Sequence, residues 1–169
     1  HLGFRNVRVL DGGIDAWTAA GAPTESGPSV LAAGDFTPSS PCIGRLLAAA
    51  DAKRYAARHL LLDARPSDRF RGENETIDTV AGHIPGGVSA PALANVDPGG
   101  CFLPADWLAT RFRRLGAADA KSVGTYCGSG IQATHLALAL SVAGICDNAD
   151  VYIGSWSDWI TDPERAVEV

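Results

Sequence analysis

Short apolar runs set between stretches of helical character restrict the possible fold more than any other feature of this 169-residue chain. Residues 59–63 (His-Leu-Leu-Leu-Asp) are apolar enough for a strand buried on both faces, and 122–126 form a second such run. Further elements are predicted as strands over 87–90 and 149–153 and as helices over 43–58, 104–115 and 132–143. The alternation predicts an α/β fold with a mainly parallel central sheet.

Composition and charge exclude several classes of protein. With 46% hydrophobic and 20% charged residues the chain is typical of globular proteins, and no apolar run is long enough to cross a bilayer. A net charge of -5 offers no basic surface to nucleic acid. The first residues lack the pattern of a secretory signal. We therefore expect a cytoplasmic protein with neither a membrane nor a nucleic acid as partner.

The four cysteines are Cys42, Cys101, Cys127 and Cys146. Their spacing matches no metal-binding pattern, so we expect no metal site and reduced thiols in a reducing compartment. The chain contains no methionine and starts at His1, from which we expect a fragment or a processed form of a longer protein.

The start of the chain has an organisation of its own. Residues 7–13 (Val-Arg-Val-Leu-Asp-Gly-Gly) predict a strand and a turn, and 14–20 predict a helix that stops at Gly21. Residues 21–41 then hold four of the ten prolines and show no periodicity, as linkers do. A domain boundary is expected near 22–38.

Cys127 stands where a predicted buried strand meets a predicted helix, in the run Cys-Gly-Ser-Gly-Ile-Gln. Ligands of open α/β sheets bind at the carboxyl ends of strands, and glycines let successive backbone N–H groups turn toward an anion. These donors and the positive end of a helix stabilise a thiolate, the nucleophilic form of a thiol. Most free cysteines are buried structural residues, but this context favours a nucleophile. The other three cysteines lack the context and are expected to be structural.

Phosphatases and arsenate reductases use a similar thiolate loop. The phosphatase signature requires an arginine six positions after the cysteine to bind the phosphoryl group, and position 133 is alanine here. Without a cation in the loop, phosphoryl transfer is disfavoured and a substrate of lower charge is expected.

The run Cys127-Gly-Ser-Gly-Ile-Gln-Ala133 resembles the active-site loop of the 3-mercaptopyruvate sulfurtransferases of the rhodanese superfamily. Three further stretches resemble family motifs in family order: 62–72 (LDARPSDRFRG), 81–86 (AGHIPG) and 154–159 (GSWSDW). The resemblance implies a catalytic rhodanese-like domain over 39–169, with helices on both faces of the sheet. Residues 1–21 resemble the C-terminal end of a first rhodanese domain, which makes 22–38 an interdomain linker.

The resemblance also implies a chemistry. The Cys127 thiolate takes sulfur from a small-molecule donor, 3-mercaptopyruvate, releasing pyruvate and leaving a persulfide. A thiophilic acceptor, either a thiol such as thioredoxin or cyanide, then removes the outer sulfur, and no cofactor is required. The loop residues that surround the substrate are Gly128, Gly130, Ile131 and Gln132. At Gln132 the family more often has threonine, so the rim of the pocket differs.

Three arginines follow the first buried strand. Arg69 matches the family position that binds the substrate carboxylate, a role suited to a guanidinium. For Arg65 the sequence leaves substrate binding and an internal ion pair with Asp63 equally open, and Arg71 is expected on the surface. The family often has a second arginine about nine residues after the first; 73–80 contain none, so weaker substrate binding is expected.

Ser129 matches the serine proposed in the family to relay a proton with a His and an Asp of the first domain. Both partners are expected to be absent from this chain. His83, Trp156 and Trp159 are expected to be structural.

Two alternative functions remain open. A thiosulfate:cyanide sulfurtransferase would have a more cationic loop, and a non-catalytic rhodanese interaction module would normally lack the cysteine.

Overall fold

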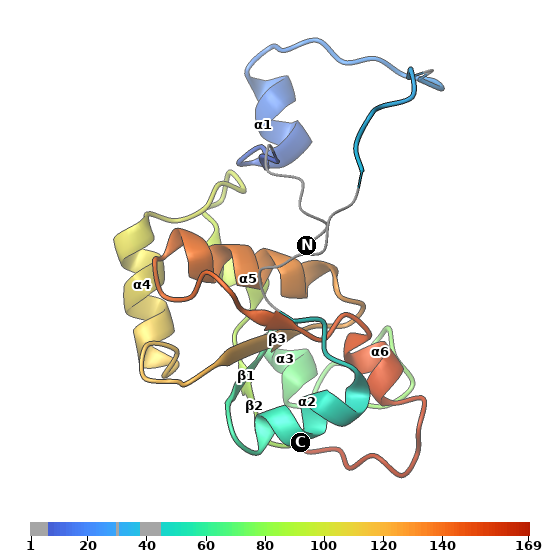
Figure 1. Ribbon diagram of the computed structural model, residues 1–169, viewed down its shortest axis with the longest axis vertical. Helices are drawn as coiled ribbons and strands as arrows, with labels where there is room; N and C mark the ends of the chain where they lie inside the picture. Colours follow the sequence, from blue (N-terminus) through green and yellow to red (C-terminus); the bar gives the residue numbers. More distant parts are fainter. Residues whose placement is uncertain (1–6, 30, 38–44) are drawn as a thin grey trace.

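The computed structural model describes residues 7–29, 31–37 and 45–169, and it contains a four-stranded parallel sheet with the order β2-β1-β3-β4 (Figure 1). The strands are β1 (Leu60–Asp63), β2 (Gly87–Ser89), β3 (Val123–Tyr126) and β4 (Asp150–Val151). The helices are α1 (Gly13–Ala19), α2 (Ala49–Ala56), α3 (Ser67–Phe70), the 3-10 helix η1 (Ala92–Asn95), α4 (Ala105–Arg114), α5 (Ile131–Val142) and α6 (Ser155–Trp159). The predicted α/β fold with a parallel sheet is confirmed.

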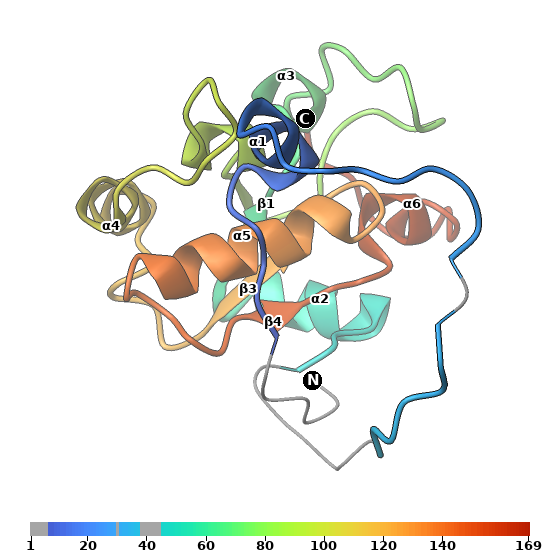
Figure 2. The same ribbon diagram turned by 90° about the horizontal axis from the view of Figure 1, so that it is seen from above.

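Helices cover both faces of the sheet, as Figures 1 and 2 show. Successive side chains of a strand point to opposite faces, and the neighbours Leu61 and Leu62 of β1 belong to two separate hydrophobic clusters. Leu62 packs with residues of α4 and α5, whereas Leu61 packs with residues of α2 and α6. Both leucines are fully buried, which explains why β1 is a continuous apolar run. None of the helices among the described residues has both the length and the apolar character needed to cross a membrane.

The strand order places a crevice at the carboxyl ends of β1 and β3. The chain proceeds from β1 to β2 on one side and from β3 to β4 on the other, so the order reverses between the two central strands. Asp63 at the end of β1 pairs in register with Tyr126 at the end of β3. The next residues therefore lie side by side, and the Ala64 N–H donates to the Tyr126 carbonyl at 2.8 Å.

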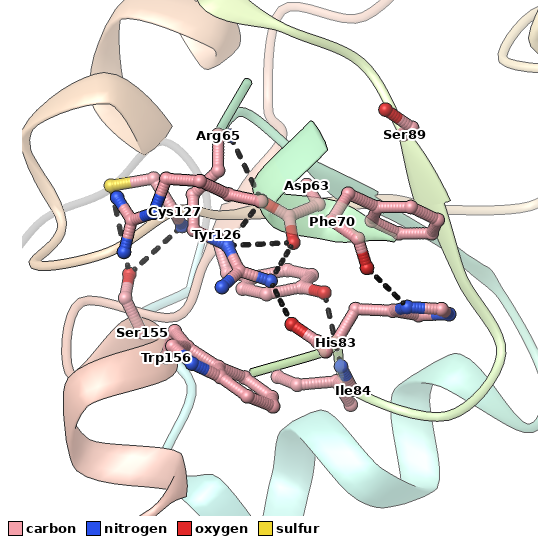
Figure 3. A network of polar contacts seen from close by, with 12 residues as sticks. Asp63, Arg65, Phe70, His83, Ile84, Ser89, Tyr126, Cys127, Ser155 and Trp156 are labelled. Atoms are coloured by element: carbon pink, nitrogen blue, oxygen red, sulfur yellow. Dashed lines mark hydrogen bonds and ion pairs between the residues drawn. The ribbon is translucent and has the colours of Figure 1, made fainter. Parts of the chain in front are cut away.

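A buried ion pair lies beneath this crevice (Figure 3). Asp63 and Arg65 have no exposed side-chain surface, and Arg65 Nη2 lies 2.7 Å from Asp63 Oδ2. The same Nη2 donates to the Gly82 carbonyl at 2.7 Å, and the guanidinium stacks 4.6 Å from the Trp156 ring centroid. Burial by itself lowers the pKa of Arg65, but hydrogen bonds to Asp63 and the Asp63 charge outweigh it and raise the pKa overall.

The N-terminal segment stands off the main body on the side of α5 (Figure 1). The predicted helix forms as α1, but the predicted strand over 7–10 does not. Val7, Val9, Leu10 and Ile14 are 53–68% exposed. A strand needs neighbouring strands for its hydrogen bonds, and none of the described strands pairs with this segment. A hydrogen bond ties it to the domain, in which the Phe102 N–H donates to Asp11 Oδ1 at 2.9 Å.

Replacing Arg65 by methionine is expected to lower the free energy of unfolding by about 3–5 kcal/mol, because Asp63 is then left buried without its partner. The measurement is urea unfolding followed by circular dichroism. Arg71→Met is the matched control, because Arg71 pairs with Glu73 on the surface and its loss should change stability little. Equal losses in the two variants would contradict the importance of burial for this pair.

Candidate active site

Cys127 follows β3 directly and lies at the crevice, with 2% of its surface exposed. Its sulfur accepts a hydrogen bond from the Gly130 N–H at 3.1 Å. Its own N–H donates to Ser155 Oγ at 3.0 Å (Figure 3). The 12-residue helix α5 begins one residue after Gly130, so the positive end of its dipole is directed toward the sulfur. This environment stabilises negative charge on sulfur.

Gly130 has a backbone conformation that side chains rarely adopt. Its φ is +92°, and a Cβ atom at this position would lie 2.7 Å from the Ile153 carbonyl oxygen. Glycine is therefore required for the N–H of residue 130 to reach the Cys127 sulfur. At Gly128 a Cβ would lie 3.7 Å from Arg69 Nη1, which places this guanidinium nitrogen against the loop.

Ser155 is a site residue that the sequence analysis missed. It is fully buried and has a φ of 56°, the only positive φ among the described non-glycine residues. Its hydroxyl donates to the Tyr152 carbonyl at 2.8 Å while accepting the Cys127 N–H, and its oxygen lies 3.9 Å from the Cys127 sulfur. Strain of this kind often marks functional sites. The only signal in the sequence was its place in the Gly-Ser-Trp motif after β4.

Backbone N–H groups in the first turn of α6 donate hydrogen bonds to the Cys127 loop. Trp156 N–H donates to the Cys127 carbonyl at 2.9 Å, and Ser157 N–H donates to the Gly128 carbonyl at 3.0 Å. Trp156 and Trp159 are buried, as expected for packing residues.

A cavity of about 400 Å³ opens beside Cys127. It contains most of the residues predicted from the sequence, and its lining consists of Pro66, Arg69, Ile77, Asp78, Cys127, Gly128, Ser129, Ile131, Gln132 and Ser157. Gly130 is outside the lining and acts through its N–H to the sulfur. Ser129 is exposed at the cavity, and its hydroxyl has no hydrogen-bond partner within the described part of the chain. Pro66, Ile77, Asp78 and Ser157 were not predicted as site residues.

Arg69 is in the cavity wall, but two carboxylates already hold its guanidinium. Nε lies 3.0 Å from Glu75 Oε2, while Nη2 lies 2.8 Å from Glu75 Oε1 and 2.9 Å from Asp78 Oδ2. Burial raises the pKa of Glu75, but backbone N–H groups of Asp78 and Ile77 together with Arg69 outweigh it and hold the pKa below its usual value. Glu75 is therefore ionised, and Nη1 is the part of Arg69 directed at the loop.

Arg65 requires a correction. The sequence left substrate binding and an ion pair with Asp63 equally open for Arg65, and the structure contains the ion pair. The guanidinium is fully buried and absent from the cavity lining, so it does not meet a substrate there. His83 is structural as expected, because its ring stacks on Phe70 and its Nδ1 lies 2.8 Å from the Phe70 carbonyl oxygen.

Cys101 and Cys146 lie outside the lining of this cavity. Both are free thiols, and Cys42 is outside the described residues. Within the described ranges, no three His, Cys, Asp or Glu side chains gather closely enough to hold a metal ion.

Comparison with known proteins gives a consistent assignment. A family model described as "Rhodanese-like domain" matches residues 45–162. A probable 3-mercaptopyruvate sulfurtransferase of Pseudomonas aeruginosa is 45% identical over 98% of this chain and 59% of its own length. A putative thiosulfate sulfurtransferase, SseB of Mycobacterium tuberculosis, is 39% identical over 98% of this chain and 58% of its own length. The chain thus spans less than two thirds of these relatives.

Solved structures agree on the fold. The wild-type structure of EanB superposes with a TM-score of 0.85 at 22% identity, covering 99% of this chain and 42% of that chain. The crystal structure of YnjE gives a TM-score of 0.82 at 28% identity, covering 99% of this chain and 44% of that chain.

Replacing Gly130 by alanine is expected to slow alkylation of Cys127 by iodoacetamide about tenfold or more. The clash with Ile153 withdraws an N–H that stabilises the thiolate, and hydrogen bonds to charged groups contribute about 1.5–3 kcal/mol. The rate is measured by mass spectrometry of the Cys127 peptide.

Gly144→Ala is the control for this prediction, because Gly144 also has a positive φ but a Cβ there meets nothing within 4 Å. Both variants strain the backbone, and only the first should change the alkylation rate. Equal rates in the two variants would show that the Gly130 N–H does not activate the sulfur.

Proposed function

This chain belongs to the rhodanese-like domain family, and we propose that it transfers sulfur from a small-molecule donor to a thiophilic acceptor through a persulfide on Cys127. The observation that carries the proposal is the Cys127 sulfur itself. It accepts the Gly130 N–H at the positive end of α5 and lines a cavity of about 400 Å³. A thiolate held this way is a competent nucleophile with room for a small donor beside it.

The first half-reaction is nucleophilic attack on the donor's sulfur. With 3-mercaptopyruvate, a bond forms between the Cys127 sulfur and the donor sulfur while the carbon–sulfur bond breaks. The electron pair of that bond goes to carbon as the enolate of pyruvate, which takes a proton and leaves as pyruvate. The persulfide anion retains the contact with the Gly130 N–H, which stabilises it as it stabilised the thiolate.

The second half-reaction returns the enzyme to its starting state. The thiolate of an acceptor, or cyanide, attacks the outer sulfur, and the electron pair of the sulfur–sulfur bond goes back to Cys127. The two steps require no metal or organic cofactor, because the nucleophile alone carries the sulfur between them.

3-Mercaptopyruvate is our first choice of donor and thiosulfate our second. The loop amides are supplied by Gly128, Ser129 and Gly130 without a cation among them, which favours the less charged donor. Arg69 Nη1, close to the loop, is the group that we assign to the donor's negative end. Thiosulfate keeps its place because the relative from Mycobacterium tuberculosis carries that name.

Further parts of the proposal concern the parent protein. We assign residues 1–21 to the end of a first rhodanese domain, 22–38 to the linker and 39–169 to the catalytic domain. The apolar side chains of Val7 and Ile14 are exposed, which supports the proposal that the rest of a first domain covers them. The Ser129 hydroxyl has no partner within the described residues, which supports the proposal that the first domain supplies its relay groups. As acceptor we propose a thiol protein such as thioredoxin, in the cytoplasm. The three cysteines among the described residues are free thiols, which fits a reducing compartment.

Cys127→Ser is expected to abolish sulfur transfer while the fold persists, because an alcohol at neutral pH does not supply an ionised, polarisable nucleophile. Incubation with 3-mercaptopyruvate should release pyruvate from the wild type and add one sulfur to the Cys127 peptide in mass spectrometry. Cys146→Ser is the control and should retain activity, because Cys146 is outside the cavity lining. Turnover by the Cys127→Ser variant would disprove the proposed function.

A further inference from the structure

The cavity beside Cys127 contains a carboxylate, Asp78, that was not predicted from the sequence. Among the described residues that line it, Arg69 is the one cation and Asp78 the one carboxylate. Asp78 is fixed on both sides, since Oδ2 lies 2.9 Å from Arg69 Nη2 and Oδ1 accepts the Ser157 hydroxyl at 2.8 Å. Its side chain is 9% exposed, so this charge faces the cavity more than bulk solvent.

The charges around Arg69 do not balance. Glu75 accepts from Nε and pairs with Nη2 of the guanidinium, and Asp78 accepts from the same Nη2. Arg65 Nη1 also lies 3.6 Å from Glu75 Oε2, and Arg65 in turn pairs with Asp63. With this pair included, two positive and three negative charges leave the cluster with a net charge of about -1, because the depressed pKa of Glu75 keeps that carboxyl ionised. An anionic donor therefore finds a guanidinium whose edge is occupied and a carboxylate next to it.

We propose that Asp78 is a specificity-determining residue that sets the charge of the sulfur donor which the site accepts. It competes with an anionic donor for Arg69 and repels a second negative charge, so a monoanion such as 3-mercaptopyruvate is favoured over a dianion such as thiosulfate. The inference rests on the proposed function for its choice of donors. The electrostatic effect itself does not, because any reagent that reaches Cys127 experiences the same charge.

A purely structural role for Asp78 makes a different prediction. If it only held Ser157 and the neighbouring chain in place, its replacement would change the reactivity of Cys127 toward all reagents alike. If its charge acts on the incoming molecule, the change scales with the charge of that molecule. Ratios between reagents of different charge separate these two roles, because any change in the nucleophile cancels from a ratio.

The first arm of the experiment compares two alkylating reagents of nearly equal size, neutral iodoacetamide and singly negative iodoacetate. Second-order rate constants are measured at the Cys127 peptide by mass spectrometry, for wild type and for Asp78→Asn. The ratio of the iodoacetate rate constant to the iodoacetamide rate constant is expected to rise roughly tenfold in the variant. This is the effect of removing one unit charge about 10 Å from the charge of the reagent, at an effective dielectric constant near 20. Asp78→Ser removes the same charge and is used instead if the Asp78→Asn variant unfolds at a much lower temperature than wild type.

Glu73→Gln is the matched control. It removes one carboxylate from the same segment, but Glu73 pairs with Arg71 on the surface, with 57% of its side chain exposed. Its ratio should stay at the wild-type value. An unchanged ratio in both Asp78 variants, or an equal rise in Glu73→Gln, would overturn the inference.

The second arm uses two sulfur donors with similar leaving groups, methanethiosulfonate with one negative charge and thiosulfate with two. In each, the outer sulfur moves to Cys127, the sulfur–sulfur bond of the donor breaks, and the electron pair leaves with methanesulfinate or sulfite. Asp78→Asn should increase the rate of persulfide formation for both donors relative to wild type. Because the repulsion is proportional to the charge of the donor, the increase for thiosulfate should be about the square of the increase for methanethiosulfonate. Equal factors for the two donors would overturn the assignment of donor selectivity.

The two arms distinguish failure of this inference from failure of the proposed function. If neither donor loads sulfur onto Cys127 while the alkylation ratio still rises, sulfur transfer is disproved and the electrostatic role of Asp78 is supported. If both donors load sulfur and neither ratio moves, the proposed function is supported and the inference is overturned.

Discussion

The ion pair between Asp63 and Arg65 is the interaction on which the rest of this site depends. Removing two charges completely from water costs free energy, which hydrogen bonds to the buried groups must offset. These hydrogen bonds fix the positions of both side chains. Arg65 links the end of β1 to the Gly82 carbonyl and to the Trp156 ring. Trp156 lies in the first turn of α6, whose N–H groups hold the carbonyls of the Cys127 loop. The nucleophile is thus anchored through a chain of buried contacts that begins at Asp63.

The same segment shows why residue type alone did not fix function. Arg65, Arg69 and Arg71 lie within seven residues, yet the first is fully buried, the second is in the cavity and the third is on the surface. Their positions depend on the chain's path through the four-residue helix α3, which is too short to leave a periodic pattern in the sequence. The sequence left two roles open for Arg65, and only its burial beside Asp63 decides between them.

Most of the long elements were predictable because burial imposes a pattern on them, but the helix predicted over 43–58 forms among the described residues only as α2, Ala49–Ala56. The predicted strands over 59–63 and 122–126 begin within one residue of β1 and β3, and α4 and α5 also form within one residue of their predicted bounds. Cys127 could be placed because a strand, two glycines and a helix determine the geometry of its loop. The strand over 7–10 failed because pairing depends on distant residues, and Ser155 escaped because positive φ in a serine has no local signature. The division into 1–21, 22–38 and 39–169 remains a prediction.

Activation of the nucleophile and selection of the donor depend on different groups in this site. The thiolate is stabilised by the Gly130 N–H and by the end of α5, which are backbone dipoles fixed by the fold. The charge of an incoming donor instead meets Arg69 and Asp78, two side chains in the lining of the cavity. On the proposed function, substitution at the second pair can alter the preferred donor while the persulfide chemistry at Cys127 stays the same. A rhodanese-like domain can therefore change its donor through a few side chains, because the dipoles that make the sulfur reactive belong to the backbone.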